Sequence, residues 1–469
     1  MEALLLIAAT VGLIALAIYA LHGSLPLGCL IVIVAGSVFG HAFARFDLGP
    51  LPLTTDRVAL VVLVAVYVLR RRWGGVAPKP LGWVDWTLAG LLAVLTASVA
   101  THPFRVGLTD VPPPIWLLVT AYLMPAVVYW IARQSPWTES QVRVLDRGLL
   151  FFGVYLAVTA ICETQDLSAF VFPRYISDPA VGLHFGRARG PFVHSVTMGF
   201  VLSTCFAVAL VAWPRAQQLG RVWLVGLAAL FALAQYLTYT RSVWMGAAAI
   251  VFVVVGLLAS REWRPWLIAG LTFASLVVVA AKWESLLEFK RDEGLSSRET
   301  ADSARLRPVM AYIAWQMFLD RPIQGCGLGR YIVDKDEYLS DRSTELRLEL
   351  ARGYGPHNQF LALLTETGLI GVGLFSAVLL GWTINAWRLW RSAAPDWARR
   401  QGLLTLAVMS AYLTSAMFHD MSFSATCHML LFFVAGMSEG VRQLASGQSQ
   451  HGASSDEAEA IEEPIAALV

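Results

Sequence analysis

Long apolar runs recur along most of the chain and are separated by polar connections. An uninterrupted run of about eighteen apolar residues is long enough to cross a bilayer as a helix. We expect these crossings at roughly residues 2–20, 25–42, 55–70, 82–100, 113–132, 147–163, 191–213, 222–239, 243–259, 265–282, 359–386, 401–418 and 424–441. The pattern predicts an all-α, polytopic integral membrane protein with about 12–13 transmembrane helices. The lower number holds if 2–42 contains one crossing and a re-entrant piece.

Arginines in the connections predict which way the chain faces. They cluster at 70–72, 133–147, 215–221, 261–264 and 388–400, which are alternate connections. Basic residues favour cytoplasmic loops, so all five clusters can face the cytoplasm at once. The connection 164–190, the turn 238–242 and the long stretch 283–357 would then share the external face, where they can build one site.

This topology divides the chain into four parts. They are an N-terminal transmembrane bundle (1–282), a large periplasmic loop (283–357), C-terminal transmembrane helices (358–442) and a disordered acidic cytoplasmic tail (443–469). Within 306–322, Val309, Ile313 and Met317 recur at helical spacing. They predict an amphipathic helix that lies on the membrane surface or over the bundle.

Composition narrows the function classes. Hydrophobic residues make up 57% of the chain and charged residues 14%, while the net charge of +2 gives no basic field for nucleic acid. The five cysteines lack CxxC spacing, which argues against a disulfide framework or a zinc site. No DxD-like pair or His/Asp cluster on the external side would hold a divalent ion, so we expect neither a metal nor a cofactor.

The segment YGPHNQFLALLTETGLIGVGLF (354–375) carries two candidate residues. Asn358 is a suitable N-cap for a helix that starts near 359, which places His357 at the water boundary. Glu366 would lie about 12 Å deeper at the helical rise of 1.5 Å per residue. Three glycines would give a smooth face for close helix packing: Gly368, Gly371 and Gly373.

Several polar residues of the external side have a functional and a structural interpretation. His357 can be a catalytic base or an interfacial histidine with a local hydrogen bond. Glu366 can be functional, or it can cap a backbone group or pair with an arginine, since an intramembrane carboxylate is costly. We interpret His194 as a core or capping histidine and His419 as part of a polar turn.

The external arginines also have two interpretations. Arg241 can be a helix-end anchor that snorkels to the interface, yet the positive-inside bias disfavours an arginine there. Arg187 and Arg189 can be a solvated loop pair, or they can be held near the membrane surface by the helix that begins at Gly190.

Arginines and a histidine at an external lipid boundary suit diphosphate chemistry. Guanidinium groups bind phosphate through paired hydrogen bonds and can stabilise a departing diphosphate. A neutral imidazole can take the proton of an attacking hydroxyl.

Four blocks of the sequence carry a family resemblance. They are RARGPFVHSVTMGFVL (187–202), TYTRSVWMGAAAI (238–250), ARLRPVMAYIAWQMFLDRPIQGCGLGRY (304–331) and PHNQFLALLTETGLIG (356–371). In these blocks the chain resembles the bacterial O-antigen ligase and polysaccharide polymerase superfamily. Order and spacing agree from about 185 to 375, whereas the N-terminal third matches only as generic membrane helix.

The resemblance implies a metal-independent glycosyltransferase at the periplasmic face of the bacterial inner membrane, in O-antigen or surface polysaccharide biosynthesis. It implies transfer of a glycan from a polyprenyl (undecaprenyl) diphosphate donor to lipid A-core or to a lipid-linked glycan acceptor. The matching positions are His357 as base, Arg189 and Arg241 for the donor diphosphate with Arg187 as a substitute for Arg189, and Arg307, Glu366 and Asn358 in supporting roles. The alternative is a transporter or flippase for a lipid-linked sugar, which would favour deep polar residues and an inverted repeat.

Overall fold

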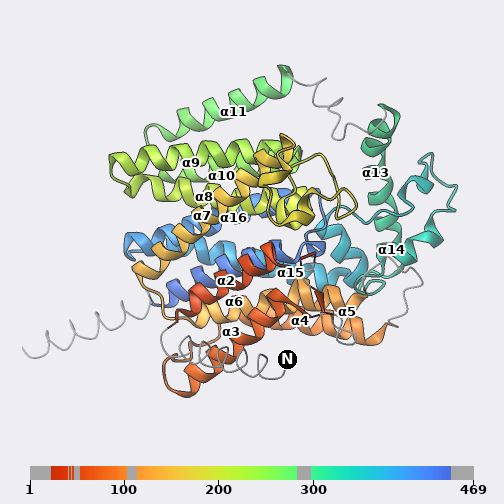
Figure 1. Cartoon of the computed structure of the whole chain (residues 1–469). Coiled ribbons are helices and arrows are strands. Elements are labelled where there is room, and N and C mark those ends of the chain that lie inside the picture. Colours follow the sequence, from red (N-terminus) through yellow and green to blue (C-terminus); the bar gives the residue numbers. More distant parts are fainter. Residues whose placement is uncertain are drawn as a thin grey trace, which may run out of the picture.

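The computed structural model describes residues 23–40, 42–43, 45–46, 53–102, 113–281 and 297–444. These residues fold almost entirely into helices (Figure 1). The longer helices are α2 (Leu25–Val38), α3 (Thr55–Arg72), α4 (Trp83–Thr101), α7 (Glu139–Thr164), α8 (Ser195–Ala212), α9 (Gln218–Leu237), α10 (Arg241–Leu258), α11 (Arg264–Ala281), α13 (Ser297–Asp320), α15 (Gln359–Arg391) and α16 (Asp396–Ala416). A further helix covers 425–444. Two short strands, β1 (Arg45–Phe46) and β2 (Leu53–Thr54), pair antiparallel.

The predicted spans coincide with these helices wherever the structure describes the chain. The span 113–132 is one continuous rod, made of α5 (Pro114–Leu117), the π-helical η1 (Leu118–Leu123) and α6 (Met124–Gln134). In the part of the chain that the structure describes, seven helices are long and apolar enough to cross a membrane by length and composition. The protein is therefore a polytopic, all-α membrane protein. The predicted span 2–20 lies outside the described residues, as do 445–469 of the predicted tail.

Capping residues decide where two of the helices begin. Asn358 caps α15, because its side-chain oxygen accepts hydrogen bonds from the N–H groups of Phe360 and Leu361 at 2.9 and 3.0 Å. This confirms the predicted start. α7 begins eight residues before the predicted 147, because Thr138 and Gln141 form a reciprocal capping box. Hydrophobicity alone misses that charged first turn.

The connections separate into two groups at opposite ends of the bundle. At one end, Ala188 N donates to the carbonyl oxygen of Leu237 at 3.0 Å and Thr240 Oγ1 to Ser195 Oγ at 3.2 Å. At the other end, Arg215 pairs with Asp396 at 2.8 Å. The long helices run across Figure 1 between these ends, with α13 and α14 (Tyr331–Asp334) at their right-hand ends. The structure thus groups the loops as the arginine pattern predicts, while the cellular side of each end stays a prediction.

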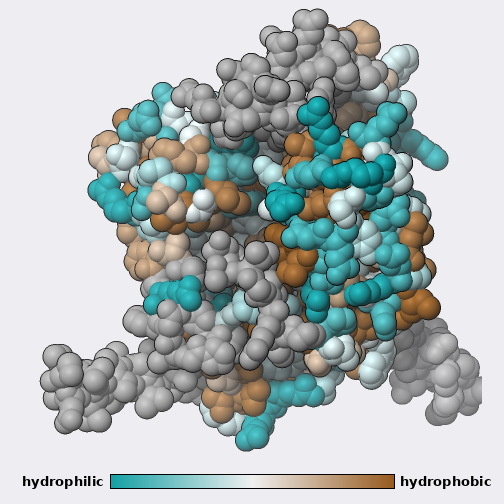
Figure 2. Space-filling model, turned by 90° about the vertical axis from the view of Figure 1, so that its right-hand side faces the viewer, coloured by the Kyte–Doolittle hydropathy of each residue, from teal (hydrophilic) through white to brown (hydrophobic). Residues whose placement is uncertain are grey.

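The stretch after α13 has a small hydrophobic core of its own. Val309, Ile313 and Met317 are buried together with Leu339 and Leu348 from the following loop. The predicted amphipathic helix therefore exists, although α13 begins earlier than predicted, and its apolar face is covered by protein. Between α14 and α15 the chain forms only two short 3-10 helices, η6 (Lys335–Tyr338) and η7 (Leu348–Ala351), among the described residues. Figure 2 views this end of the molecule and shows hydrophilic side chains gathered over much of one side.

Gly368 breaks α15 instead of smoothing its surface. Its φ of +62° and ψ of −163° lie outside the helical region, so the helix is kinked there. A Cβ on Gly368 would lie 2.2 Å from the carbonyl oxygen of Ile323, which is too close for any side chain. The predicted smooth glycine face is wrong at this position. The glycine instead admits the backbone of the loop that follows α13.

Candidate functional site

The segment 417–419, at the end of α16, joins three regions that are far apart in the sequence. The Met417 carbonyl oxygen accepts a hydrogen bond from Asn358 Nδ2 at 3.0 Å. The Phe418 ring lies under the guanidinium of Arg307, with 5.1 Å between Cζ and the ring centroid. These contacts bring the start of α15 and the helix α13 to one corner.

The next residue of the segment reaches the start of α10. His419 Nε2 lies 2.9 Å from Ser242 Oγ, and Ser242 directly follows Arg241. Residues of the arginine block at 238–242, of α13 and of the histidine-asparagine pair therefore contact one short segment. That they form one functional site stays a prediction. We had interpreted His419 only as part of a polar turn. The sequence placed His419 on a predicted external connection, between the spans 401–418 and 424–441, and only this position could have indicated that it lies near the site.

Arg241 and Arg307 form a pair of neighbouring cations. Burial, followed by the positive charge of Arg241, lowers the pKa of the Arg307 guanidinium below its ordinary value. The Nε of Arg241 is buried and has no hydrogen-bond partner in the structure. Among the described residues, neither guanidinium forms an ion pair with a carboxylate. Two adjacent guanidiniums without an acidic partner suit a bound anion.

His357 occupies an exposed turn directly before the cap of α15. Its φ of +44° puts the backbone in the left-handed region, and its ring centroid lies 6.2 Å from that of Tyr354. Lys335 fixes this turn from below, because its buried Nζ donates to the carbonyl oxygens of Ala351 at 2.8 Å and Tyr354 at 2.5 Å. Burial lowers the pKa of Lys335 to about 8. The turn that precedes His357 is therefore held in place by a buried lysine.

His194 adds a second imidazole to the same neighbourhood. It caps α8, with Nδ1 2.9 Å from Thr197 Oγ1, and its ring centroid lies 6.1 Å from that of His184. Burial first, then the nearby His184, His357 and Arg187, lower the pKa of His194 to about 4. The capping role agrees with our interpretation. Its closeness to His357 was missed, because the two histidines are far apart in sequence, and the only signal was a histidine on a predicted external connection.

Arg189 does not join this group through its guanidinium. The side chain is buried and donates to the carbonyl oxygens of Ile176 at 2.8 Å and Asp178 at 2.7 Å, and its Nε lies 3.8 Å from Glu163 Oε1. Glu163 Oε2 also accepts from the N–H groups of Arg189 and Gly190 at 3.1 and 2.8 Å. These bonds hold the 164–190 connection in shape. Arg187, the predicted substitute, is the member of the pair that lies close to His194.

Glu366 contacts the glycine-rich loop 325–331. Its Oε1 accepts a hydrogen bond from Tyr331 N at 3.3 Å, and its carbonyl oxygen accepts from Gly327 N at 2.9 Å. A Cβ on Gly325 would come within 2.3 Å of the Glu366 backbone, so this position requires glycine. Glu366 therefore holds the loop 325–331 against α15. Its predicted supporting role in the site stays a prediction.

One comparison with known proteins found a match, and it covers the middle of the chain. The family model described as O-Antigen ligase matches residues 226–376. This stretch contains three of the four resemblance blocks and includes Arg241, Arg307, His357 and Glu366, whereas the block at 187–202 precedes it. No curated protein matches the chain.

Proposed function

We propose that this protein transfers a glycan from a polyprenyl diphosphate donor at the external face of the inner membrane. The proposal is supported by the match of residues 226–376 to the family model described as O-Antigen ligase. The family supports a glycosyltransferase of the ligase or polymerase type in general. The donor, the acceptor and the residue roles are our proposal.

One observation carries this proposal. The 417–419 segment contacts Arg307 of α13, Ser242, which follows Arg241, and Asn358, which follows His357. Two guanidiniums without a carboxylate partner among the described residues, together with an imidazole on a supported turn, suit the transfer of a group from a diphosphate.

The donor diphosphate would lie against Arg241 and Arg307, with Arg187 near the imidazoles. The acceptor hydroxyl forms the new bond to the anomeric carbon of the donor glycan while the bond from that carbon to the diphosphate oxygen breaks. His357 takes the hydroxyl proton, and the guanidiniums stabilise the negative charge that the leaving diphosphate gains. Arg189 is not given a donor role here, because carbonyl oxygens and Glu163 already engage its guanidinium.

The acceptor is lipid A-core in a ligase and a second lipid-linked glycan in a polymerase. The test is reconstitution of the full chain in liposomes with a polyprenyl-diphosphate glycan, with each acceptor supplied separately. Extension of one acceptor with release of polyprenyl diphosphate is the expected result. Movement of the donor across the bilayer without any glycan product would replace the enzyme with the flippase alternative.

A further inference from the structure

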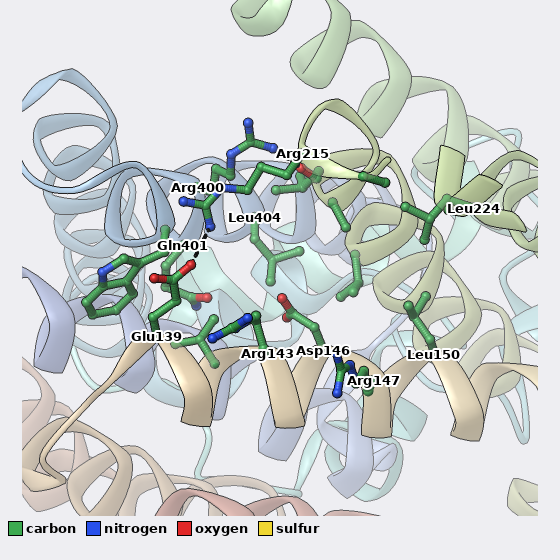
Figure 3. A pocket seen from close by; sticks show the side chains of 17 residues that line it. Glu139, Arg143, Asp146, Arg147, Leu150, Arg215, Leu224, Arg400, Gln401 and Leu404 are labelled. Atoms are coloured by element: carbon green, nitrogen blue, oxygen red, sulfur yellow. Dashed lines mark hydrogen bonds and ion pairs between the residues drawn. The ribbon is translucent and has the colours of Figure 1, made fainter. Parts of the chain in front are cut away.

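We propose that a cavity at the arginine-rich end of the bundle binds an anionic phospholipid. The cavity has a volume of about 450 Å³ and lies among the first half of α7, the last turns of α8, the start of α9 and the start of α16 (Figure 3). That volume is far larger than a phosphate ion needs and falls in the range of organic ligand sites.

The cavity is separate from the candidate glycan-transfer site. His194 precedes the first residue of α8, whereas Val208 and Val211 line the cavity near its last residue. Leu404 of α16 lines the cavity, and Met417 at the other end of the helix belongs to the site. Thirteen residues of helix separate these two, which is about 20 Å. The inference therefore does not rest on the proposed function.

The polar rim has a surplus of positive charge. Arg215 is neutralised by Glu139 at 3.3 Å and by Asp396 at 2.8 Å, and Asp396 also pairs with Arg400 at 2.8 Å. These two guanidiniums and two carboxylates balance one another. The surplus of positive charge therefore comes from the other two arginines of the lining, Arg143 and Arg147, which Asp146 offsets only in part.

Arg143 and Arg147 supply the free charge of the rim. Both are exposed residues of α7 that line the cavity, and neither forms an ion pair within the part of the chain that the structure describes. They lie four residues apart, so they share one face of the helix and can hold one phosphate together. In Figure 3, Asp146 rises from α7 between Arg143 and Arg147, and Arg400 lies on the opposite side of the cavity.

Asp146 decides which kind of anion fits. Its carboxyl group lines the cavity between the two arginines, and in its ionised form it opposes a multiply charged anion that enters deeply. A phosphodiester carries a single charge and can stay at the rim with Arg143 and Arg147. The charge pattern therefore favours a lipid head group over a nucleotide or a sugar diphosphate.

The deeper lining is apolar and suits an acyl chain. Leu150, Leu224 and Leu404 supply it. The neighbouring Phe151 of α7 is 78% exposed and Val222 of α9 is 66% exposed, so the outer faces of both helices are apolar and belong in lipid. An acyl chain can thus reach the cavity from the surrounding bilayer, and basic pockets between transmembrane helices are suited to anionic head groups.

The experiment uses the full chain in detergent, with lipid retention measured by native mass spectrometry. Phosphatidylglycerol and phosphatidylcholine with identical acyl chains are the two probes. We expect the protein to retain phosphatidylglycerol in preference to phosphatidylcholine. The double variant Arg143→Gln/Arg147→Gln should weaken that retention on the order of 30-fold.

The matched control is Arg388→Gln/Arg391→Gln, which removes two exposed arginines from the last turn of α15 outside the cavity. It should retain phosphatidylglycerol as the unmodified protein does. Equal losses in both double variants, equal retention of both lipids, or displacement of phosphatidylglycerol by inorganic phosphate would each overturn the proposal. The thermal midpoint without lipid shows whether each variant is folded, and its rise with phosphatidylglycerol gives a second measure of binding.

Discussion

The two ends of the helix bundle both carry arginines, but the arginines of the two ends differ in their ion pairing. At the end with the cavity, Arg215 and Arg400 pair with Asp396, and the buried Arg133 pairs with Asp85 at 2.8 Å. Arg143 and Arg147 are the exceptions at that end, since neither forms an ion pair with a described residue. At the end with the candidate site, Arg241 and Arg307 have no carboxylate partner among the described residues. Pairing within the protein thus separates arginines that stabilise the fold from arginines that can receive an anionic substrate.

The largest expected effect comes from the imidazole of the candidate site. His357→Ala should reduce glycan transfer by roughly 10²- to 10⁴-fold, because the acceptor hydroxyl loses its base. The assay is product formation in liposomes at saturating donor. Added imidazole should restore part of the activity of this variant, which a purely structural loss would not allow. Full transfer without imidazole would remove His357 from the mechanism.

The unpaired arginines should come next. Arg307→Ala should lower kcat/KM for the diphosphate donor by roughly 10²-fold, since one group that stabilises the leaving charge is gone. The matched control is Arg321→Ala in the same part of the chain, where the exposed guanidinium lies 3.8 Å from Asp334. Similar losses in both variants would show that the effect is general and not specific to the site.

Arg189 should contribute to the stability of the fold, as the paired arginines of the opposite end do. Arg189→Ala should destabilise the protein by about 3–5 kcal/mol, because Glu163 is left buried without its cation. Thermal denaturation of the purified protein measures this. Arg174→Ala is the control, since this exposed arginine of the same connection donates to the Ser168 carbonyl oxygen. An unchanged midpoint together with lost donor use would return Arg189 to the diphosphate site.

The sequence predicted the helices well because their hydrophobic runs and caps are local features. Asn358 caps α15 through a hydrogen bond to Phe360, two residues later, so no distant contact is needed to predict the start of this helix. The surroundings of two other residues could not be predicted, because they depend on distant contacts. Gly368 is a kink only because Ile323, more than forty positions earlier, lies against it. Arg189 is engaged only because the loop at 176–181 folds back over it.

The histidine beside the site gives a smaller, pH-dependent effect. His194 has a folded pKa of about 4, below the ordinary 6.5, so the unfolded chain binds its proton more readily. Its contribution to stability is therefore present above pH 6.5 and is lost as the pH falls toward 4. His194→Asn keeps a capping side chain but cannot titrate there. The thermal midpoint of this variant should fall less between pH 6.5 and 4 than that of the unmodified protein, and parallel curves would contradict the assignment.

The smallest effect should come from the cap of α15. Asn358→Ala should cost about 1 kcal/mol of stability, because the N–H groups of Phe360 and Leu361 lose their acceptor. Asn358→Asp restores that acceptor but not the hydrogen bond to Met417. Comparison of the two midpoints separates the cap from the link to α16, and equal midpoints for both variants would mean that the cap contributes nothing.

The contrast between the two ends can be measured directly in one assay. Release of polyprenyl diphosphate would be followed for Arg241→Ala/Arg307→Ala and for Arg215→Ala/Arg400→Ala, per mole of folded protein in liposomes. The account predicts that release is lost in the first double variant and retained in the second. Equal release from both would contradict it.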